Sequence, residues 1–336
     1  MRDRNGAYFQ LNTSSLRQAS VVGGLSLSSN LICHAALQAE MQPWIEMECF
    51  QLSQGKRLGQ LDSIDLGNQR IVRETQEATV HKVGATPANL CTLSYCSLDP
   101  ACRFSEHDAG NAGTIFFMSE QTEFDIYVPA GAQTTYISLD QDEFLSAARV
   151  LNPAEWENAP SGVTMLYSRQ KALFQDAVEM WFKVAAMPGN AMHADVMRRL
   201  LFQTMLQIAT TTTQDNASNL PAAARLRALR ICRDARTFAE NLLETEDLPT
   251  IVELCAAVGV SERTLQYAFR TYAGMSPLVY LRKLRLNRVR TALMQASPSE
   301  MTVTAAAMRY GFLHLSRFAQ DYKRVFDETP SVTLAS

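Results

Sequence analysis

The last third of the chain contains the same hydrophobic pattern twice. In each copy, apolar residues lie one, four, five and eight positions before a glycine. The first copy consists of Ile251, Leu254, Cys255, Val258 and Gly259, and the second of Val303, Ala306, Ala307, Tyr310 and Gly311. This spacing places the apolar side chains on one face of a short helix, and glycine is a typical helix end. The sequence therefore predicts two short helices that each stop at a glycine.

Each glycine is followed by a second helical segment, residues 261–269 in the first copy and residues 313–322 in the second. A helix, a tight turn and a second helix form the arrangement that places an exposed helix in the major groove of DNA. Two such units in tandem indicate a protein that reads two segments of the groove. The side chains expected to face inward are Leu265, Phe269, Phe318 and Tyr322.

The outward positions of these second helices carry side chains that can read bases. Arginine and glutamine form paired hydrogen bonds with guanine and adenine edges, and an apolar side chain can contact a thymine methyl group. An isolated helix with such a face is usually only a solvated surface, but the repeated pattern favours DNA contact. The residues predicted to contact DNA are Arg263, Thr264, Gln266, Tyr267, Arg270, Leu315, Ser316, Arg317, Gln320 and Lys323.

One long helix is expected to join the two units. The segment from Ser276 to Met294 has a proline in its first turn and no later helix breaker. A stiff connector would hold the two reading helices about one turn of the duplex, roughly 34 Å, apart. Because the second turn is one residue longer than the first, we expect one chain to read an asymmetric site in two parts.

Upstream, the hydrophobic segments are short and separated by turn residues. Such strands are typical of a small barrel or sandwich, which can enclose one small ligand. Two helices are expected to follow, over residues 171–186 and 192–210, and the polar segment 210–219 is the predicted linker. It divides the chain into domains of residues 1–215 and 216–336. The strands are predicted at residues 46–52, 69–74, 89–94, 113–119, 123–128 and 134–139.

The second of the two predicted helices carries a single apolar stripe. Its members are Met197, Leu200, Leu201, Met205 and Ile208. A single stripe is the usual pattern of a helix that covers its own domain. We therefore favour packing on the domain's own core over packing on a second subunit.

Charge is divided unevenly between the two parts. Residues 221–336 hold 16 basic and 11 acidic residues, a net charge of +5, which leaves 15 basic and 23 acidic residues for the rest, a net charge of −8. This division is typical of a polyanion-binding domain joined to another domain. No apolar run is long enough to span a membrane, the N-terminus is polar, and the seven cysteines are scattered. We expect reduced thiols and a cytoplasmic location, associated with the nucleoid when DNA is bound.

Residues from about 227 to 334 resemble the DNA-binding domain of the AraC/XylS family of bacterial transcription regulators. The matching motifs are Val260-Ser-Glu-Arg-Thr-Leu265, Phe269 with Gly274 and Pro277, Arg285-Leu-Asn-Arg-Val-Arg290, Tyr310-Gly-Phe312, and Ser316-x-Phe318-x-x-x-Tyr322-Lys323-x-x-Phe326-x-x-x-Pro330. Two positions depart from the family pattern. His314 lies where a capping acid or hydroxyl is common, and Asp327 lies where glycine is common, so weaker helix ends are expected at both.

A second resemblance is to the subgroup that contains the ethanolamine-operon activator. Its motifs lie at residues 311–322 and 330–334, with further similarity at residues 51–59 and 113–117. This resemblance implies a sensor domain and a catabolic or stress operon as the target. The effector is left open.

The alternatives are an enzyme, either a thiol alkyl acceptor or a metal oxygenase, fused to a helix-turn-helix tail, and a ligand-independent architectural protein. Four and five residues separate Cys91, Cys96 and Cys102, whereas structural zinc sites favour closer pairs and four ligands. The five histidines are isolated, with no His-x-His pair at metal-ligand spacing. No nucleophile elbow or P-loop is present. These patterns favour a protein without catalytic residues, metal or cofactor.

We therefore predict an α+β chain. Its N-terminal domain is expected to be a small, cupin-like β-barrel with helices that senses a small-molecule effector. Its C-terminal domain is expected to be all-α, with two helix-turn-helix units joined by a long helix. The predicted function is effector-responsive activation of an operon, with double-stranded DNA and RNA polymerase as partners, a homodimer as a further assembly, and no membrane contact.

Overall fold

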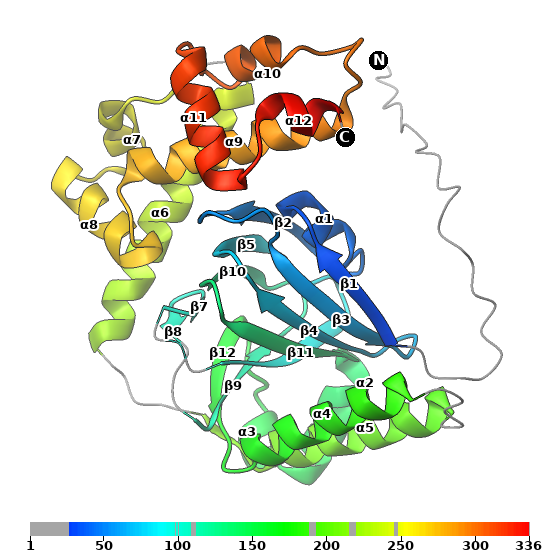
Figure 1. Ribbon diagram of the computed structural model, residues 1–336. Coiled ribbons are helices and arrows are strands. Elements are labelled where there is room, and N and C mark those ends of the chain that lie inside the picture. The colour runs from blue at the N-terminus through cyan, green and yellow to red at the C-terminus, as the bar shows by residue number, and fades with distance from the viewer. Residues whose placement is uncertain are drawn as a thin grey trace, which may run out of the picture.

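The computed structural model describes residues 27–97, 99, 101–108, 112–187, 193–214, 220–244 and 248–335. These residues form a part rich in β-sheet, followed along the chain by a helical part that packs against one end of it (Figure 1). The predicted α+β class is confirmed. The predicted boundary between residues 215 and 216 lies outside the described residues, as do residues 215–219 of the predicted linker.

The N-terminal part contains two antiparallel sheets. The larger has the strand order β1-β3-β4-β11-β6-β9-β12-β13, and the smaller has the order β2-β5-β10-β7-β8. The larger sheet consists of β1 (Leu27–Ile32), β3 (Gly59–Asp65), β4 (Arg70–Gln76), β6 (Leu90–Cys96), β9 (Thr114–Met118), β11 (Gln133–Asp140), β12 (Val163–Tyr167) and β13 (Thr213–Gln214). The smaller consists of β2 (Glu46–Gln51), β5 (Val80–Ala85), β7 (Arg103–Phe104), β8 (His107–Asp108) and β10 (Glu123–Val128).

The prediction of a β-barrel is wrong in one detail: both sheets are open. β1 pairs only with β3, and β13 pairs only with β12, so the two edges of the larger sheet do not meet within the described residues. The six predicted strands are confirmed as β2, β4, β6, β9, β10 and β11. Strands β3, β5 and β12 were also missed. Of the remaining strands, β7, β8 and β13 are only two residues long, and β1 is mostly exposed.

Helices cover the outer face of the larger sheet. They are α2 (Gln141–Leu151), α3 (Pro153–Trp156), α4 (Lys171–Ala186) and α5 (Ala194–Thr210), while the short α1 (Ala35–Glu40) follows β1. Both predicted helices are confirmed, although the expected start of the second at Met192 lies outside the described residues. Met197, Leu201 and Met205 are fully buried in the core beneath, as predicted, whereas Leu200 is 45% exposed.

The C-terminal part consists of helices. They are α6 (Leu220–Glu244), α7 (Ile251–Val258), α8 (Glu262–Ala273), α9 (Pro277–Gln295), α10 (Val303–Arg309), α11 (Leu315–Phe326) and α12 (Pro330–Ala335). The predicted long connector is confirmed as α9. Helix α6 was not predicted; it packs along α7 and α8.

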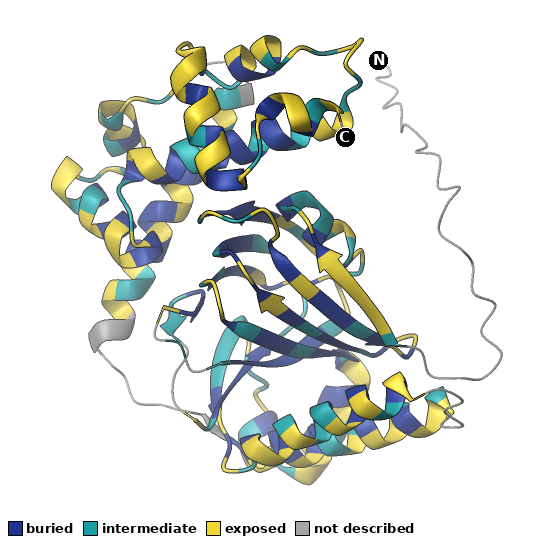
Figure 2. Cartoon of the chain, in the orientation of Figure 1, coloured by how far each residue is buried: buried dark blue, intermediate teal, exposed yellow. Residues whose placement is uncertain are grey.

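Two separate apolar cores hold these helices (Figure 2). One joins α6, α7, α8 and the start of α9, and it includes Phe50 and Leu52 at the end of β2. The other joins the end of α9 to α10, α11 and α12, and its residues all come from the C-terminal part. The first helix-turn-helix unit therefore shares its core with the N-terminal part, and the second does not.

Candidate nucleic-acid interface

The first unit begins with a complete capping box. The Thr250 hydroxyl accepts a hydrogen bond from the Glu253 amide at 3.2 Å, and the Glu253 carboxylate accepts one from the Thr250 amide at 2.8 Å. Helix α7 ends at Gly259, whose φ of +69° lies in the left-handed region that favours glycine. The predicted helix and its glycine stop are confirmed.

Helix α8 starts three residues after this glycine and has one buried face. The Ser261 hydroxyl accepts a hydrogen bond from the Thr264 amide at 3.2 Å, which caps the helix. Leu265 and Phe269 are fully buried, as predicted. Of the residues predicted to contact DNA, Arg263, Tyr267 and Arg270 are exposed, whereas Thr264 and Gln266 are partly buried.

The second unit has weaker helix ends. Thr302 caps α10, but His314 makes no side-chain hydrogen bond at the start of α11. That helix ends at Asp327, a non-glycine residue with a φ of +55°. The expected loss of a side-chain cap is thus seen at His314, whereas the Asp327 amide still caps its helix end by donating to the Lys323 carbonyl at 2.9 Å. Gly311, with a φ of +74°, forms the turn, and a Cβ atom there would lie 2.5 Å from the Leu248 side chain.

Helix α11 also presents one polar face to solvent. Phe318 and Tyr322 are buried, as predicted. The outward residues predicted to contact DNA are all exposed; they are Leu315, Ser316, Arg317, Gln320 and Lys323. The structure thus places every predicted contact residue on α8 or α11, and whether they contact DNA stays a prediction.

The basic residues in this part of the chain fall into two groups, those that form an ion pair and those that do not. Arg263, Arg270, Arg317 and Lys323 form no ion pair with any described residue. In contrast, Arg282 lies 2.5 Å from Asp321, and Arg290 lies 2.9 Å from Glu328. The unpaired cations on α8 and α11 are available to phosphates and base edges.

Helix α9 binds the edge strand β2 through side-chain hydrogen bonds and thereby joins the helical part to the N-terminal part. The Asn287 side chain accepts a hydrogen bond from the Gln51 amide at 2.9 Å and donates one to the Gln51 carbonyl at 3.0 Å. Asn287 thus satisfies both backbone groups of a strand edge, as a neighbouring strand would. Beside it, Arg288 binds both carboxylate oxygens of Glu48, at 2.7 and 2.9 Å.

A buried polar network is the second contact between the helical part and the N-terminal part. Two tyrosines of the helical part reach the His81 ring, with Tyr272 Oη 2.8 Å from Nε2 and Tyr280 Oη 2.8 Å from Nδ1. Asp125 Oδ1 lies 3.0 Å from His81 Nε2 and 3.0 Å from Arg103 Nη2. Tyr272 is near the end of α8, so the first reading helix is tied directly to the N-terminal sheet.

The chemistry of this network favours a neutral histidine. Burial lowers the pKa of His81, although Asp125 opposes that shift. Burial alone would raise the pKa of Asp125, but His81, Arg103 and Arg236 hold it below its usual range. With Nε2 protonated, His81 donates to Asp125 while Nδ1 accepts from Tyr280.

Acidification is expected to destabilise the protein as the pH falls below about 6.5, the ordinary pKa of histidine. The pKa of His81 is lower in the folded chain than in the unfolded chain, so the unfolded chain binds more protons in this range. His34 acts in the same direction, because burial and Arg290 lower its pKa to about 4 and its Nδ1 accepts a hydrogen bond from the Leu37 amide. Thermal denaturation at pH 7.5, 6.5 and 5.5 measures this effect.

His81→Gln should reduce the slope of stability against pH. The exposed His314→Gln variant serves as the matched control and should retain the slope. Equal slopes for His81→Gln and the unmodified chain would contradict a neutral His81.

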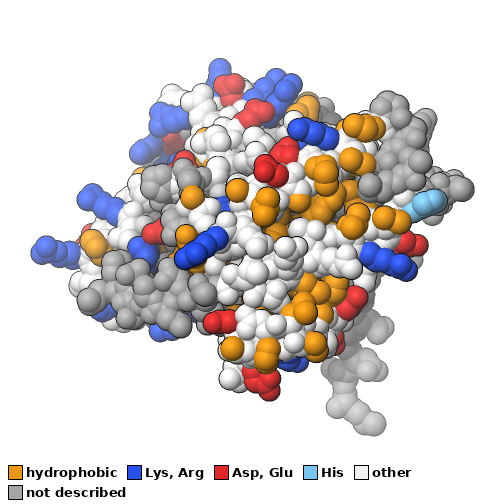
Figure 3. Space-filling view, turned by 90° about the horizontal axis from the view of Figure 1, so that it is seen from below, with side chains coloured by type: hydrophobic (Ala, Val, Ile, Leu, Met, Phe, Trp, Pro, Cys, Tyr) orange, Lys and Arg blue, Asp and Glu red, His pale blue; other side chains and the backbone are white. Residues whose placement is uncertain are grey.

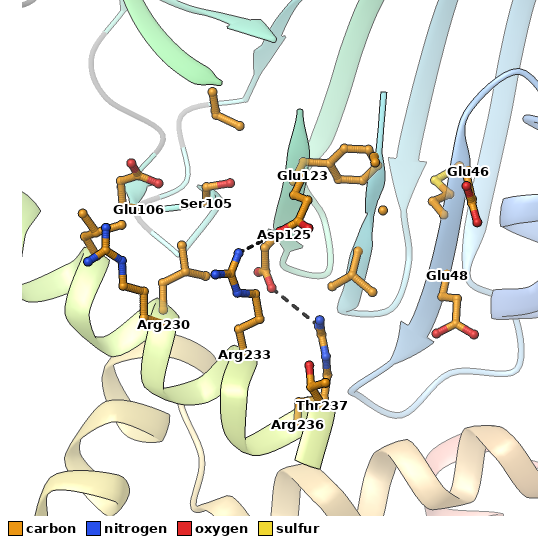
Figure 4. Close-up of a pocket in the computed structure, with 18 residues that line it drawn as sticks. Glu46, Glu48, Ser105, Glu106, Glu123, Asp125, Arg230, Arg233, Arg236 and Thr237 are labelled. Atoms are coloured by element: carbon orange, nitrogen blue, oxygen red, sulfur yellow. Dashed lines mark hydrogen bonds and ion pairs between the residues drawn. The ribbon is translucent and has the colours of Figure 1, made fainter. Parts of the chain in front are cut away.

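A cleft of about 840 Å³ lies beside the network, between α6 and strands β2, β5 and β10 (Figure 4). Arg230, Arg233 and Arg236 face it from α6, opposite Glu123 and Asp125 of β10. Arg233 pairs with Glu123 at 2.9 Å. Arg236 lies 3.7 Å from Asp125, and its Nε and Nη1 atoms have no hydrogen-bond acceptor within the described residues.

The residues of the buried polar network were not predicted from the sequence. His81 and Tyr272 are 191 residues apart, and no short-range spacing links them. The available signal was indirect: Tyr272 follows Leu265 and Phe269 at helical spacing, so a buried partner was needed for its hydroxyl group. In the described part of the chain, no cluster of histidine, cysteine and acidic residues could hold a metal ion, and no helix is long and apolar enough to cross a membrane.

Comparison with known proteins supports the helix-turn-helix assignment. Residues 254–336 match a family model described as a helix-turn-helix domain. A probable thc operon regulatory protein of Rhodococcus erythropolis is 40% identical over 85 residues, which cover 25% of this chain and 26% of that protein. The XylDLEGF operon transcriptional activator of Pseudomonas putida is 39% identical over 102 residues, which cover 30% of this chain and 31% of that protein.

A solved structure is also similar to part of the chain. It is a probable AraC family transcriptional regulator from Rhodopseudomonas palustris CGA009, 36% identical, covering 31% of this chain and 94% of that chain with a TM-score of 0.29. The matched part of the chain spans only about a quarter to a third of the length of the two curated relatives. Residues 254–336 of the C-terminal part thus match a helix-turn-helix domain.

Proposed function

We propose that this chain is a sequence-specific DNA-binding regulator that activates transcription of an operon. The observation that carries the proposal is the pair of helices α8 and α11, each with two exposed, unpaired basic residues on its outer face. The similarity to operon regulators supports it and gives no support to an enzyme. RNA polymerase is its expected partner, and the cytoplasm its expected location. The finer likeness to ethanolamine-operon activators gains no support from these relatives, whose names refer to other operons.

We further propose that the cleft beside α6 receives a small-molecule effector. Its volume lies within the range of ligand sites. The arginines of α6 that line the cleft could bind an anionic group of a ligand. Because the cleft is lined by both parts of the chain, a ligand there would bind one relative placement of them more tightly than another.

Selection of bound duplexes from random DNA, followed by footprinting, tests the DNA-binding function. We expect one defined site that is protected in two segments. Broad coating of DNA without a defined site would instead indicate an architectural protein. Transcription from a promoter fragment that carries the selected site would then be measured with and without the protein. An increase would indicate activation, and a decrease would indicate repression.

Arg317→Ala is expected to weaken binding to the selected site by about 1–3 kcal/mol and to relax specificity at one base position. The reason is that an exposed, unpaired arginine on a reading helix can form two hydrogen bonds with guanine. Lys323→Ala, one turn and a half further along α11, is the matched comparison and should weaken selected and random DNA equally. Equal losses on both DNAs for Arg317→Ala would make Arg317 a phosphate contact.

A further inference from the structure

The two turn glycines of the helix-turn-helix units have different surroundings. Gly259 and Gly311 both adopt left-handed backbone angles, with φ of +69° and +74°. Among the described residues, no heavy atom beyond its chain neighbours would lie within 4 Å of a Cβ atom on Gly259. A Cβ atom on Gly311 would instead lie 2.5 Å from both methyl carbons of Leu248. The Leu248 side chain therefore packs directly against the backbone of the second turn.

Leu248 belongs to the first unit along the chain. It lies between α6 and α7, two residues before Thr250, whose hydroxyl caps α7. Together with Leu281 and Leu284 of α9, it lines a small pocket of about 110 Å³. Both of these α9 residues are buried in the core of the first unit. Leu248 thus lies close to the first core and also contacts the turn of the second unit.

The second turn is also held from α9. The Arg285 guanidinium donates a hydrogen bond to the Tyr310 carbonyl at 3.4 Å and lies 5.0 Å from the centre of the Phe312 ring. Phe312 is 5% exposed and belongs to the core of the second unit. The turn is therefore in contact with both α9 and the segment before α7, and Gly311 leaves the space for the Leu248 contact.

Leu248 is separate from the exposed apolar surface of the N-terminal part. Figure 3 shows hydrophobic side chains gathered at the end of the molecule where α3, α4 and α5 lie in Figure 1. Leu248 is 40% exposed and lies in the C-terminal part, at the other end of the molecule. Its position is explained by the turn that it contacts within the same chain.

We infer that Leu248 is a positioning residue that fixes the second helix-turn-helix unit relative to the first. This inference rests on the proposed DNA-binding function. Helix α9 joins the units through a single segment, and long helices bend. The Leu248 contact adds a second connection, which restricts rotation of one unit about the other. Helices α8 and α11 are thereby held at one separation and one angle, so the chain recognises its two DNA segments at one spacing only.

A change of spacing in the DNA site tests this inference. One base pair inserted between the two protected segments moves one of them by about 3.4 Å along the duplex and rotates it by about 35°. A fixed pair of units loses contacts on such a site, whereas a loosely joined pair adapts to it. The unmodified chain should therefore bind the inserted site about tenfold or more weakly than the selected site. Leu248→Ala should reduce that difference to about threefold or less and should protect both segments of the selected site.

Two further variants are the controls for this experiment. Leu248→Met keeps a large apolar side chain and should retain the full penalty for the inserted base pair. Val252 is an apolar residue of α7 that is 76% exposed, and Val252→Ala should also retain the full penalty. An unmodified chain that tolerates the insertion, or a Leu248→Ala variant that keeps the full penalty, would overturn the inference.

Chemical denaturation tests the contact without DNA. Gly259→Ala and Gly311→Ala introduce the same left-handed strain, but only Gly311→Ala displaces Leu248. Gly311→Ala should therefore destabilise the chain more, and in the Leu248→Ala background its cost should fall to that of Gly259→Ala. Equal costs for the two alanine variants in the otherwise unmodified chain would contradict the contact. A chain without a defined DNA site would contradict the proposed function instead, and this comparison would still show whether Leu248 joins the two units.

Discussion

Asp125→Ala is expected to lower the free energy of unfolding by about 3–5 kcal/mol, because removal of one partner leaves buried charges uncompensated. Asp125 is 5% exposed and is the common partner of His81, Arg103 and Arg236. It also accepts a hydrogen bond from the Tyr272 hydroxyl. Alanine would leave two buried guanidinium groups and a tyrosine hydroxyl without this acceptor.

Chemical denaturation measures this effect, and the chain offers a close control. Glu123 lies two residues away on the same strand, and its carboxylate is 75% exposed where it pairs with Arg233. Glu123→Ala should change the stability by less than about 1 kcal/mol, as is usual for surface ion pairs. Similar losses for the two variants would show that the buried network does not hold the two parts of the chain together.

The same variant should also affect DNA binding, although Asp125 is remote from every predicted DNA contact along the sequence. Tyr272 is in the last turn of α8, and Asp125 positions it through a hydrogen bond. The placement of the first reading helix therefore depends on an N-terminal carboxylate. If the proposed effector binds in the adjacent cleft, it can therefore act on α8 through Asp125.

Elements set by near neighbours could be predicted from the sequence. The capping box at Thr250, the glycine stop at Gly259 and the long helix α9 each depend on residues within one or two turns. Helix α6 could also have been predicted, since its buried residues Ala228, Cys232 and Ala235 follow helical spacing.

Features set by distant residues could not be predicted. Whether the larger sheet closes depends on its two edge strands, which come from opposite ends of the N-terminal part. The pairing of Asn287 with Gln51 spans 236 residues. In neither case does a local pattern specify the partner, because a strand edge offers the same backbone groups to any residue that reaches it.

The two helix-turn-helix units also differ in a way that their sequences do not show. The repeats have the same hydrophobic spacing, yet the first unit includes Phe50 and Leu52 of β2 in its core. The core of the second unit contains only residues from Leu286 onward. Changes in the N-terminal part should therefore act on α8 before α11, and damage to the second core should remain local.

Phe318→Ala tests this separation. Phe318 is 1% exposed and packs against Phe312 and Tyr322, with ring centroids 5.0 and 5.7 Å away. Truncation of a buried phenylalanine costs about 3–5 kcal/mol, enough to loosen α11 in a core of this size. Footprinting on the selected site should then show loss of one protected segment and retention of the other.

Met308→Ala is the control for that experiment, because Met308 lies on α10 of the same unit, is not a predicted DNA contact and is 52% exposed. It should leave the stability nearly unchanged and retain both protected segments. If Phe318→Ala abolished both segments, α8 could not bind without α11, and the chain would have one composite reading surface. If Phe318→Ala abolishes only one protected segment, the lost segment is the half of the DNA site that α11 reads. The order of the two helix-turn-helix units along the duplex follows from that result.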